Sequence, residues 1–180
     1  MGLGETSLKW RCSFFLMFIG FICMIAAIAS TNFAYAELIP NKLKHIGFWD
    51  ICDDTQTFSC MDMIVFMTSI DRGTDWVYGC RAMVVLGLIL EFGTLLTSLW
   101  MAYMASGIHI GSLITAIADF VSVIVSLIGG LVFTFNAIDV LQETLEMDAD
   151  PSWSFAVFLF GQSLFFLGGV LQVYEACTAD

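Results

Sequence analysis

Long stretches without charge constrain this chain more than any other feature. Between Arg11 and Glu37 lie 25 residues without a charged side chain, and a helix needs only about 20 residues to cross the hydrocarbon core of a bilayer. Hydrophobic residues make up 59% of the 180 residues, against roughly 45–50% in an average soluble domain. A soluble core of this length has no room for that excess. The sequence therefore predicts a membrane protein with a first span near 13–35.

Three more spans are predicted from the remaining apolar runs. Only two charged residues, Glu91 and Asp119, fall within 82–138, a stretch that is too long for one span and suits two. The segment 105–111 contains two glycines and is the best turn between them. The last apolar run follows Pro151, and proline favours the entry of a helix. The predicted spans are 82–104, 111–135 and 153–174, which with the first make one four-span domain over residues 1–180.

A cleaved secretory signal is the alternative for the first span. Lys9 and Arg11 precede an apolar stretch that ends near Ala34-Tyr35-Ala36, a small-residue pattern typical of cleavage sites. The apolar stretch is longer than the ~7–15 residues of a signal core. We therefore expect an uncleaved first helix.

Basic residues near the spans predict the orientation of the chain. Lys9 and Arg11 precede the first span and favour a cytosolic N-terminus. Four spans then place the C-terminus in the cytosol and loops 36–80 and 136–152 outside. A few basic residues in the first loop run against this rule, but a disulfide there requires the oxidising side of the membrane. The basic residues concerned are Lys42, Lys44, Arg72 and Arg81.

The two predicted outer loops are strongly acidic, and the chain as a whole has a net charge of −11. Such a surface attracts cations within a Debye length, about 8 Å at physiological salt. Two interpretations stay open: the acids keep the loops soluble, or they select ions and dock a partner. Candidate contacts in loop one are Asp53, Asp54, Asp62, Asp71 and Asp75. The remaining loop acids are Glu37, Asp50, Asp139, Glu143, Glu146, Asp148 and Asp150.

Cys52 and Cys60 predict a small disulfide-closed hairpin in loop one. β-Branched and aromatic residues occur around 46–48 and 55–58, and Asp53-Asp54 is a turn signal between them. Trp49 precedes the first cysteine and either caps this sheet at the membrane surface, where Trp is enriched, or contacts a partner.

The other four cysteines have separate expectations. Cys80 falls at the start of the second span and is expected as a buried free thiol, and Cys23 as a core residue. Cys12 and Cys177 lie at the cytosolic ends of spans one and four, where cysteines are candidates for palmitoylation.

Glu91 and Asp119 have no Lys or Arg within their spans. A charge at mid-membrane costs about 2.5–3.5 kcal/mol on insertion scales, so we expect both acids in the bundle interior. Candidate hydrogen-bond partners there are Thr94, Ser122 and Gln162. Either they join helices as polar contacts, or they dock a polar group of another membrane subunit or line an ion path.

Several classes of function are not expected. Six scattered Lys and Arg residues give no nucleic-acid surface. His45 and His109 fall on opposite sides of the membrane in the predicted topology and cannot share a site. No Cys/His/acid group has metal-ligand spacing, and no nucleophile or phosphate-loop motif occurs. We therefore expect neither an enzyme nor a bound cofactor or metal.

Gly47-Phe48-Trp49, Cys52, Cys60 and Arg81 together resemble the signature of the claudin superfamily. This family includes claudins, peripheral myelin and epithelial membrane proteins, and regulatory subunits of calcium channels and glutamate receptors. The resemblance implies a mainly α membrane protein: a left-handed four-transmembrane-helix bundle with a small extracellular antiparallel β-sheet, formed mostly by loop one. It also implies that Arg81 links the base of the sheet to the helices.

Three departures from the family pattern stand out. Phe48 replaces a leucine, and the tryptophan usual after the first span is missing, with Phe33 or Tyr35 nearby. The C-terminal Asp180 replaces the hydrophobic residue through which many claudins bind scaffold proteins.

The resemblance implies a plasma-membrane protein of cell–cell junctions, which contributes adhesion, a barrier or a cation-favouring paracellular path. Its partners would be membrane lipids and further copies of itself, in the same or the opposing membrane. The alternatives are an auxiliary subunit bound to an ion channel or receptor through its helices and loop one, and a membrane-organising protein of the myelin type.

Overall fold

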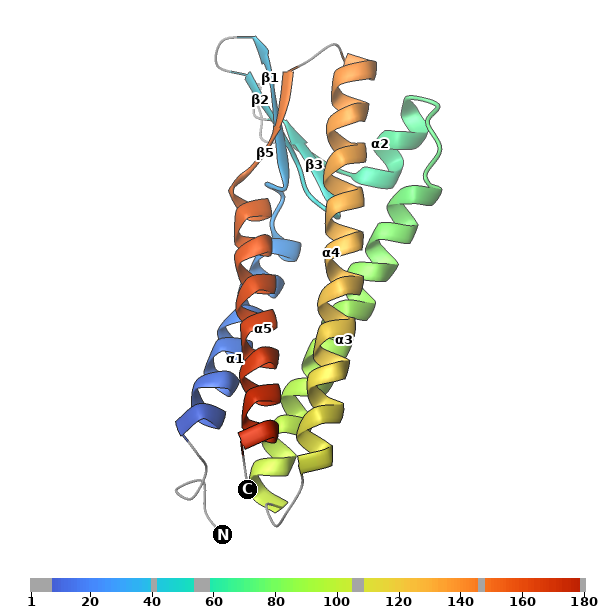
Figure 1. The fold of residues 1–180 in the computed structure, drawn as a ribbon. Coiled ribbons are helices and arrows are strands. Elements are labelled where there is room, and N and C mark those ends of the chain that lie inside the picture. The colour runs from blue at the N-terminus through green and yellow to red at the C-terminus, as the bar shows by residue number, and fades with distance from the viewer. Residues whose placement is uncertain (1–7, 40–41, 54–58, 105–108, 146–147, 179–180) are drawn as a thin grey trace.

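Four long helices and one small sheet make up the structure. It is a computed structural model, and it describes residues 8–39, 42–53, 59–104, 109–145 and 148–178. The helices run side by side, and the sheet lies at the end opposite the start of α1 and the end of α5 (Figure 1). In chain order the elements are α1 (Leu8–Ala29), β1 (Ala34–Ile39), β2 (Lys42–Ile46), β3 (Asp50–Asp53), β4 (Ser59–Asp62), α2 (Met63–Ser69), α3 (Asp75–Met104), α4 (His109–Leu145), β5 (Asp148–Pro151) and α5 (Trp153–Thr178).

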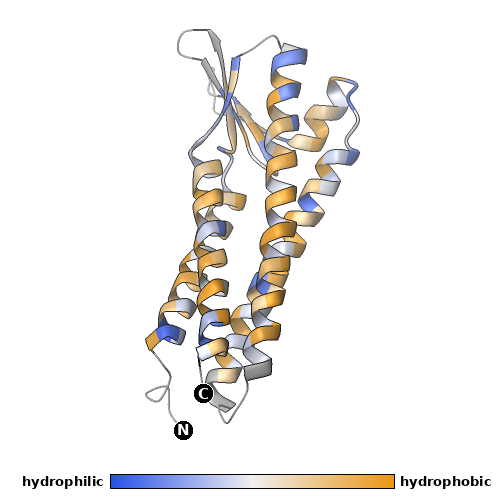
Figure 2. Cartoon of the chain, viewed as in Figure 1, coloured by the Kyte–Doolittle hydropathy of each residue, from blue (hydrophilic) through white to orange (hydrophobic). Residues whose placement is uncertain are grey.

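By length and composition, four helices are able to cross a membrane. The qualifying segments are Leu8–Ala29, Asp75–Met101, Gly111–Glu143 and Trp153–Thr178. Hydrophobic residues dominate the length of these helices, and hydrophilic residues gather on the part of α4 beside the sheet (Figure 2). The chain is thus a multi-pass membrane protein with four candidate spans, as predicted.

The helix ends differ from the predicted span ends. α1 ends at Ala29, and Ala34 and Tyr35 belong to β1 instead of the first span. α4 has 37 residues, about 55 Å at 1.5 Å per residue, whereas the bilayer core is only ~30 Å thick. Asp139 and Glu143, predicted in a loop, therefore lie on α4. The reason is that residues 131–145 contain no glycine or proline to end the helix.

The bundle is built from three main helix contacts. α1 packs on α5, α3 packs on α4, and α4 also packs on α5. α1 and α5 approach closely where Gly20 faces Gly161, because a Cβ at Gly20 would lie 2.7 Å from the carbonyl oxygen of Gly161. Below the sheet, Met17, Leu95 and Phe165 form part of a buried apolar cluster that joins the helices.

The sheet is antiparallel throughout, with the strand order β4-β3-β2-β1-β5. Four strands come from loop one, and β5 adds an edge from the segment between α4 and α5. In β1, Ala36 pairs with Lys44 of β2 on one side and with Ala149 of β5 on the other. The mainly helical fold with a four-helix bundle and a small antiparallel sheet is confirmed, while the handedness of the bundle stays a prediction.

Two local expectations for loop one were wrong in part. β2 ends at Ile46, and Phe48 lies in a bend that the backbone closes with a 2.9 Å hydrogen bond from Gly47 N–H to Asp50 O. Asp53 belongs to β3 and not to a turn. Residues 54–58, including the other predicted strand, lie outside the described residues. Of the turn predicted at 105–111, residues 105–108 also lie outside the described residues, whereas residues 109–111 belong to α4.

The short helix α2 was not predicted. Asp62 caps it, since its Oδ1 accepts a 2.7 Å hydrogen bond from Ile64 N–H. Met63 and Met67 are buried four residues apart, the spacing of one helical face. An acidic cap followed by this spacing was the available signal.

Candidate functional site

The motif residues 47–49 form the base of the sheet. A Cβ at Gly47 would lie 2.5 Å from the carbonyl oxygen of Ser30, so only glycine fits this approach to the end of α1. Phe48 is buried, and its ring stacks on Phe133 of α4 with 4.1 Å between centroids. Trp49 stays 39% exposed. The motif therefore turns one aromatic ring into the bundle and one outward.

Arg81 of α3 fixes this bend to the bundle. Its Nε donates a 2.7 Å hydrogen bond to Phe48 O, and its Nη2 donates a 3.0 Å hydrogen bond to Trp49 O. Its guanidinium lies 5.0 Å from the Trp49 ring centre, a cation–π arrangement. Asp62 Oδ2 lies 3.8 Å from Nη2 and forms an ion pair with Arg81. The structure thus supplies the link between sheet and helices that the resemblance implied for Arg81.

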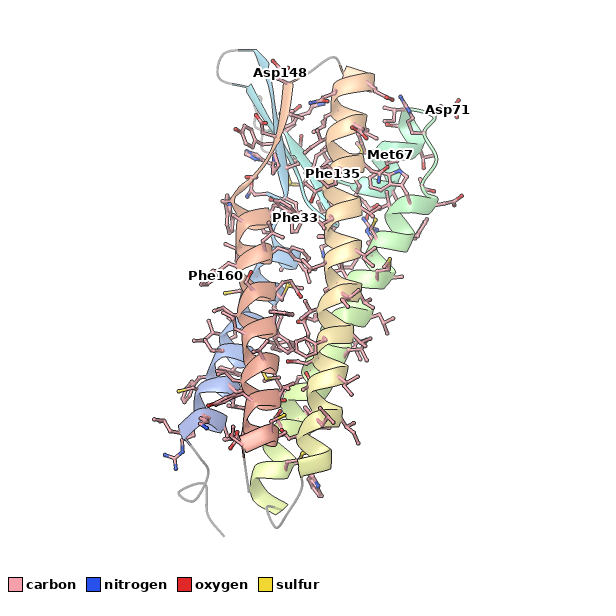
Figure 3. All side chains as sticks on the ribbon, viewed as in Figure 1. Phe33, Met67, Asp71, Phe135, Asp148 and Phe160 are labelled. Carbon is pink, nitrogen blue, oxygen red and sulfur yellow. A yellow bond between two sulfur atoms is a disulfide. The ribbon has the colours of Figure 1, made fainter. Side chains whose placement is uncertain are left out.

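Phe33 occupies the seam between sheet and bundle (Figure 3). It is fully buried, and its ring makes edge contacts with Phe48 and Phe158 at 4.6 and 5.6 Å between centroids. It also contacts Phe133 and Phe155. Of the two residues considered in place of the missing tryptophan, Phe33 fills the core and Tyr35 is half-buried in β1.

Cys52 of β3 and Cys60 of β4 form a disulfide, as predicted. The two residues are paired directly across the hairpin. Cys52 is buried and Cys60 is exposed, so the bridge ties the outer edge strand to the interior of the sheet.

The sheet end of the molecule carries a large excess of acid. Among residues whose side chains are described there, nine are acidic and three are basic. Asp71 and Asp148 lie at this end on opposite sides of the view (Figure 3). The acids are Asp50, Asp53, Asp62, Asp71, Asp75, Asp139, Glu143, Asp148 and Asp150, and the bases are Lys44, Arg72 and Arg81. We call this surface the acidic end.

Two of the three bases at the acidic end already contact acids. Arg72 Nη2 donates to Glu143 Oε2 at 3.1 Å, a bridge that holds the segment after α2 against α4. Arg81 lies beside Asp62 as described above. The candidate contacts Asp62, Asp71 and Asp75 are all exposed and Asp53 is half-buried. Asp54 and Glu146 lie outside the described residues, and so do the side chains of Glu37 and Lys42.

Glu91 and Asp119 both lie in the bundle interior, and neither is exposed. Glu91 Oε1 accepts hydrogen bonds from Gln162 Nε2 at 2.8 Å and from Ser126 Oγ at 3.2 Å. Asp119 Oδ1 accepts from Thr94 Oγ1 at 3.2 Å. Interior placement and the partners Thr94 and Gln162 agree with expectation.

Ser126 makes the hydrogen bond to a buried carboxylate that was expected of Ser122. The Ser122 hydroxyl donates to the backbone carbonyl of Asp119 and not to its carboxylate. Ser126, one helical turn further on, was missed and bonds Glu91. A second buried polar pair was also missed: Gln172 Nε2 donates to Ser98 Oγ at 2.7 Å. One sequence signal was available for both missed contacts. Polar residues recur at every third or fourth position of otherwise apolar helices, which places them on one helix face.

The four remaining cysteines are free. Cys80 is buried at the start of α3, as expected. Cys23 is half-buried where a core position was expected. Cys12 and Cys177 are exposed near the start of α1 and the end of α5. Their palmitoylation stays a prediction.

Comparison with known proteins adds no family to this geometry: no protein-family model and no curated protein matches the chain.

Proposed function

We propose that this chain is a claudin-like membrane protein that acts at contacts between cells, with its sheet outside the plasma membrane. The observation that carries the proposal is the acidic end, where nine acids and three bases lie on and around a disulfide-closed sheet. Since a disulfide persists in an oxidising compartment, the sheet is assigned to the outside. Lys9 and Arg11, at the start of α1, then lie in the cytosol.

The acidic end favours cations over anions in a narrow space between two membranes. Exposed charges act over about 8 Å at physiological salt. When two copies of this surface face each other at such a distance, their negative electrostatic potentials therefore overlap. Because Arg72 and Arg81 are already beside acids, they offset little of the remaining charge. A barrier built from this protein is therefore expected to be cation-selective.

Exposed apolar side chains beside the sheet offer a surface for another copy of the chain. Met61 of β4, Val65 of α2 and Tyr78 of α3 are 47%, 55% and 53% exposed. β4 is also an edge strand, exposed at all four residues. Edge strands present unpaired backbone groups to a neighbour. Packing in the same or the opposing membrane is expected to use this region.

An auxiliary subunit of a channel or receptor is the alternative function. Its main support in the sequence was the pair of acids in the spans. Both acids are fully buried within the chain itself, so they present no polar group to a second membrane protein. The junction proposal is preferred for that reason.

The test expresses the tagged chain in cells that lack junction strands. Enrichment at contacts between two expressing cells, with no stoichiometric channel or receptor after purification in mild detergent, supports the proposal. Uniform surface distribution together with such a partner overturns it. Val65→Glu is expected to reduce contact enrichment, and Gln142→Glu, which adds the same charge at an exposed position of α4, serves as the matched control.

A further inference from the structure

Four buried oxygen atoms in the bundle core have no hydrogen-bond donor among the described residues. They are Glu91 Oε2, Asp119 Oδ2, Gln162 Oε1 and Gln172 Oε1. All four side chains are at most 3% exposed. Buried polar atoms are nearly always hydrogen-bonded, and an unpaired buried charge is costlier still. The core thus has more acceptors than its own donors satisfy.

Gln162 sits with its amide against Glu91, and its orientation is determined by that contact. Its Nε2 donates 2.8 Å bonds to Glu91 Oε1 and to Met24 Sδ. With Glu91 ionised, turning the amide over would place its oxygen against the oxygen of Glu91, two acceptors in contact. Gln162 Oε1 therefore stays beside the carboxylate as a second open oxygen.

Asp119 is even poorer in donors than its one hydrogen bond implies. The Thr94 hydroxyl lies 3.2 Å from Asp119 Oδ1 and 2.8 Å from the backbone carbonyl of Glu91. A hydroxyl has a single proton and satisfies one of these acceptors at a time. Asp119 Oδ2 packs against α5, where a Cβ at Gly169 would lie 2.7 Å from it. Gly169 lies seven residues after Gln162, about 10 Å along the helix axis, so Asp119 is a separate buried acid.

No basic side chain in the described parts of the four helices approaches the pair. Arg81, on the same helix as Glu91, lies ten residues away, about 15 Å along the axis. The other charged residues lie toward the helix ends, and none is a hydrogen-bond partner of the pair. These charged residues are Lys9 and Arg11 on α1, Asp75 on α3, Asp139 and Glu143 on α4, and Glu175 on α5. The other titratable residues of these helices with described side chains are Cys12, Cys23, Tyr78, Cys80, Tyr174 and Cys177.

We propose that Glu91 and Gln162, with the hydroxyl of Ser126, form an intramembrane binding site for a small monovalent cation, H⁺ or Na⁺. Carboxylate, amide and hydroxyl oxygens are hard ligands that suit such a cation. The bound charge offsets a buried negative charge and gives the open oxygens a partner. Since Glu91 lies on α3, Ser126 on α4 and Gln162 on α5, the cation holds three helices together. This site is independent of the proposed junction function.

The test uses the full chain in lipid nanodiscs. Infrared spectra report the carbonyl stretch of a protonated carboxylic acid, and thermal unfolding is followed in Na⁺ and in choline at constant ionic strength. Glu91→Gln mimics the neutral acid of the site, and Asp119→Asn removes the carboxylate of the separate buried acid. Asp139→Asn, on an exposed acid of the same helix as Asp119, is the matched control.

A protonated-acid band that Glu91→Gln reduces, that Asp139→Asn leaves unchanged and that Na⁺ does not alter assigns H⁺ as the ligand. A band present in choline but lost in Na⁺, with a Tm that rises with Na⁺ concentration, assigns Na⁺. Wild-type protein with no such band in either salt and no dependence of Tm on Na⁺ overturns the proposal. The wild-type measurements decide this even if a core variant fails to fold.

Discussion

The acidic end and the bundle core use the same carboxylate groups in opposite ways. At the acidic end, most acids are exposed and their charges act through solvent. In the core, Glu91 and Asp119 are fully buried among hydroxyl, amide and apolar groups. The comparison teaches that burial, and not residue type, divides the acids of this chain. Exposed acids shape what approaches the protein, whereas the buried pair affects how its helices assemble.

The largest effect is expected at the seam between the two regions. Phe33→Ala removes a fully buried ring that four other aromatic rings contact. A change of this kind typically costs about 3–5 kcal/mol. We expect a large drop in Tm in detergent and poor surface delivery. Phe160→Ala, on a ring that is 57% exposed on α5, is the control and should change Tm little; equal losses in both variants would contradict the assigned seam.

The disulfide is expected to matter next. Cys52→Ser with Cys60→Ser opens a short loop, at a cost of about 2–3 kcal/mol in the chain-entropy estimate. The loss should be confined to the sheet, because α1, α3, α4 and α5 pack on one another independently of β4. Limited proteolysis is expected to cut near residues 50–62 first and to spare the helices. Wild-type resistance there, with normal surface delivery, would mean that the bridge is dispensable.

Arg81 is expected to have a smaller but specific effect. Arg81→Lys keeps the charge but loses the forked donation to the carbonyls of Phe48 and Trp49. Hydrogen bonds that involve a charged group contribute about 1.5–3 kcal/mol, and lysine retains part of that. We expect a moderate loss of Tm and a shift in the emission of Trp49, compared in a background where the other tryptophans are replaced by phenylalanine. Unchanged emission would show that Arg81 does not position the bend.

The Arg72–Glu143 bridge is expected to contribute least. Its side chains are 43% and 65% exposed, and exposed ion pairs contribute about 0–1 kcal/mol. Glu143→Gln should therefore leave Tm almost unchanged and should make it less sensitive to salt. A loss comparable to that of Arg81→Lys would mean that the acidic end depends on this pair for its shape.

The sequence predicted the elements with long-range signals better than those with short ones. Long apolar runs with few or no charges identified all four long helices, because a membrane span needs about 20 apolar residues. They misplaced the end of α4, since a helix continues past the membrane where nothing in residues 131–145 breaks it. α2 has only seven residues and was missed for lack of a long pattern.

The site residues also differ in how far the sequence alone predicted them. Cys52 and Cys60 were found from their spacing within a polar loop, and Arg81 from the resemblance to the claudin superfamily. Ser126 and Gln172 were missed because their partners lie 35 and 74 residues away, at Glu91 and Ser98. Contacts of that kind depend on how each helix is rotated about its axis. A mostly apolar helix with few polar residues does not determine this rotation from sequence.

The central claim is that the acidic end favours cations at cell contacts, and a permeability ratio tests it most directly. Na⁺ and Cl⁻ permeabilities are compared across epithelial monolayers that express the wild-type chain, the Asp148→Asn/Asp150→Asn variant or the charge-preserving Asp148→Glu/Asp150→Glu variant. We predict a raised Na⁺-to-Cl⁻ ratio for the wild-type chain and the glutamate variant, and a clearly lower ratio for the asparagine variant. Equal ratios in all three, at equal amounts of protein at the contacts, would contradict the claim.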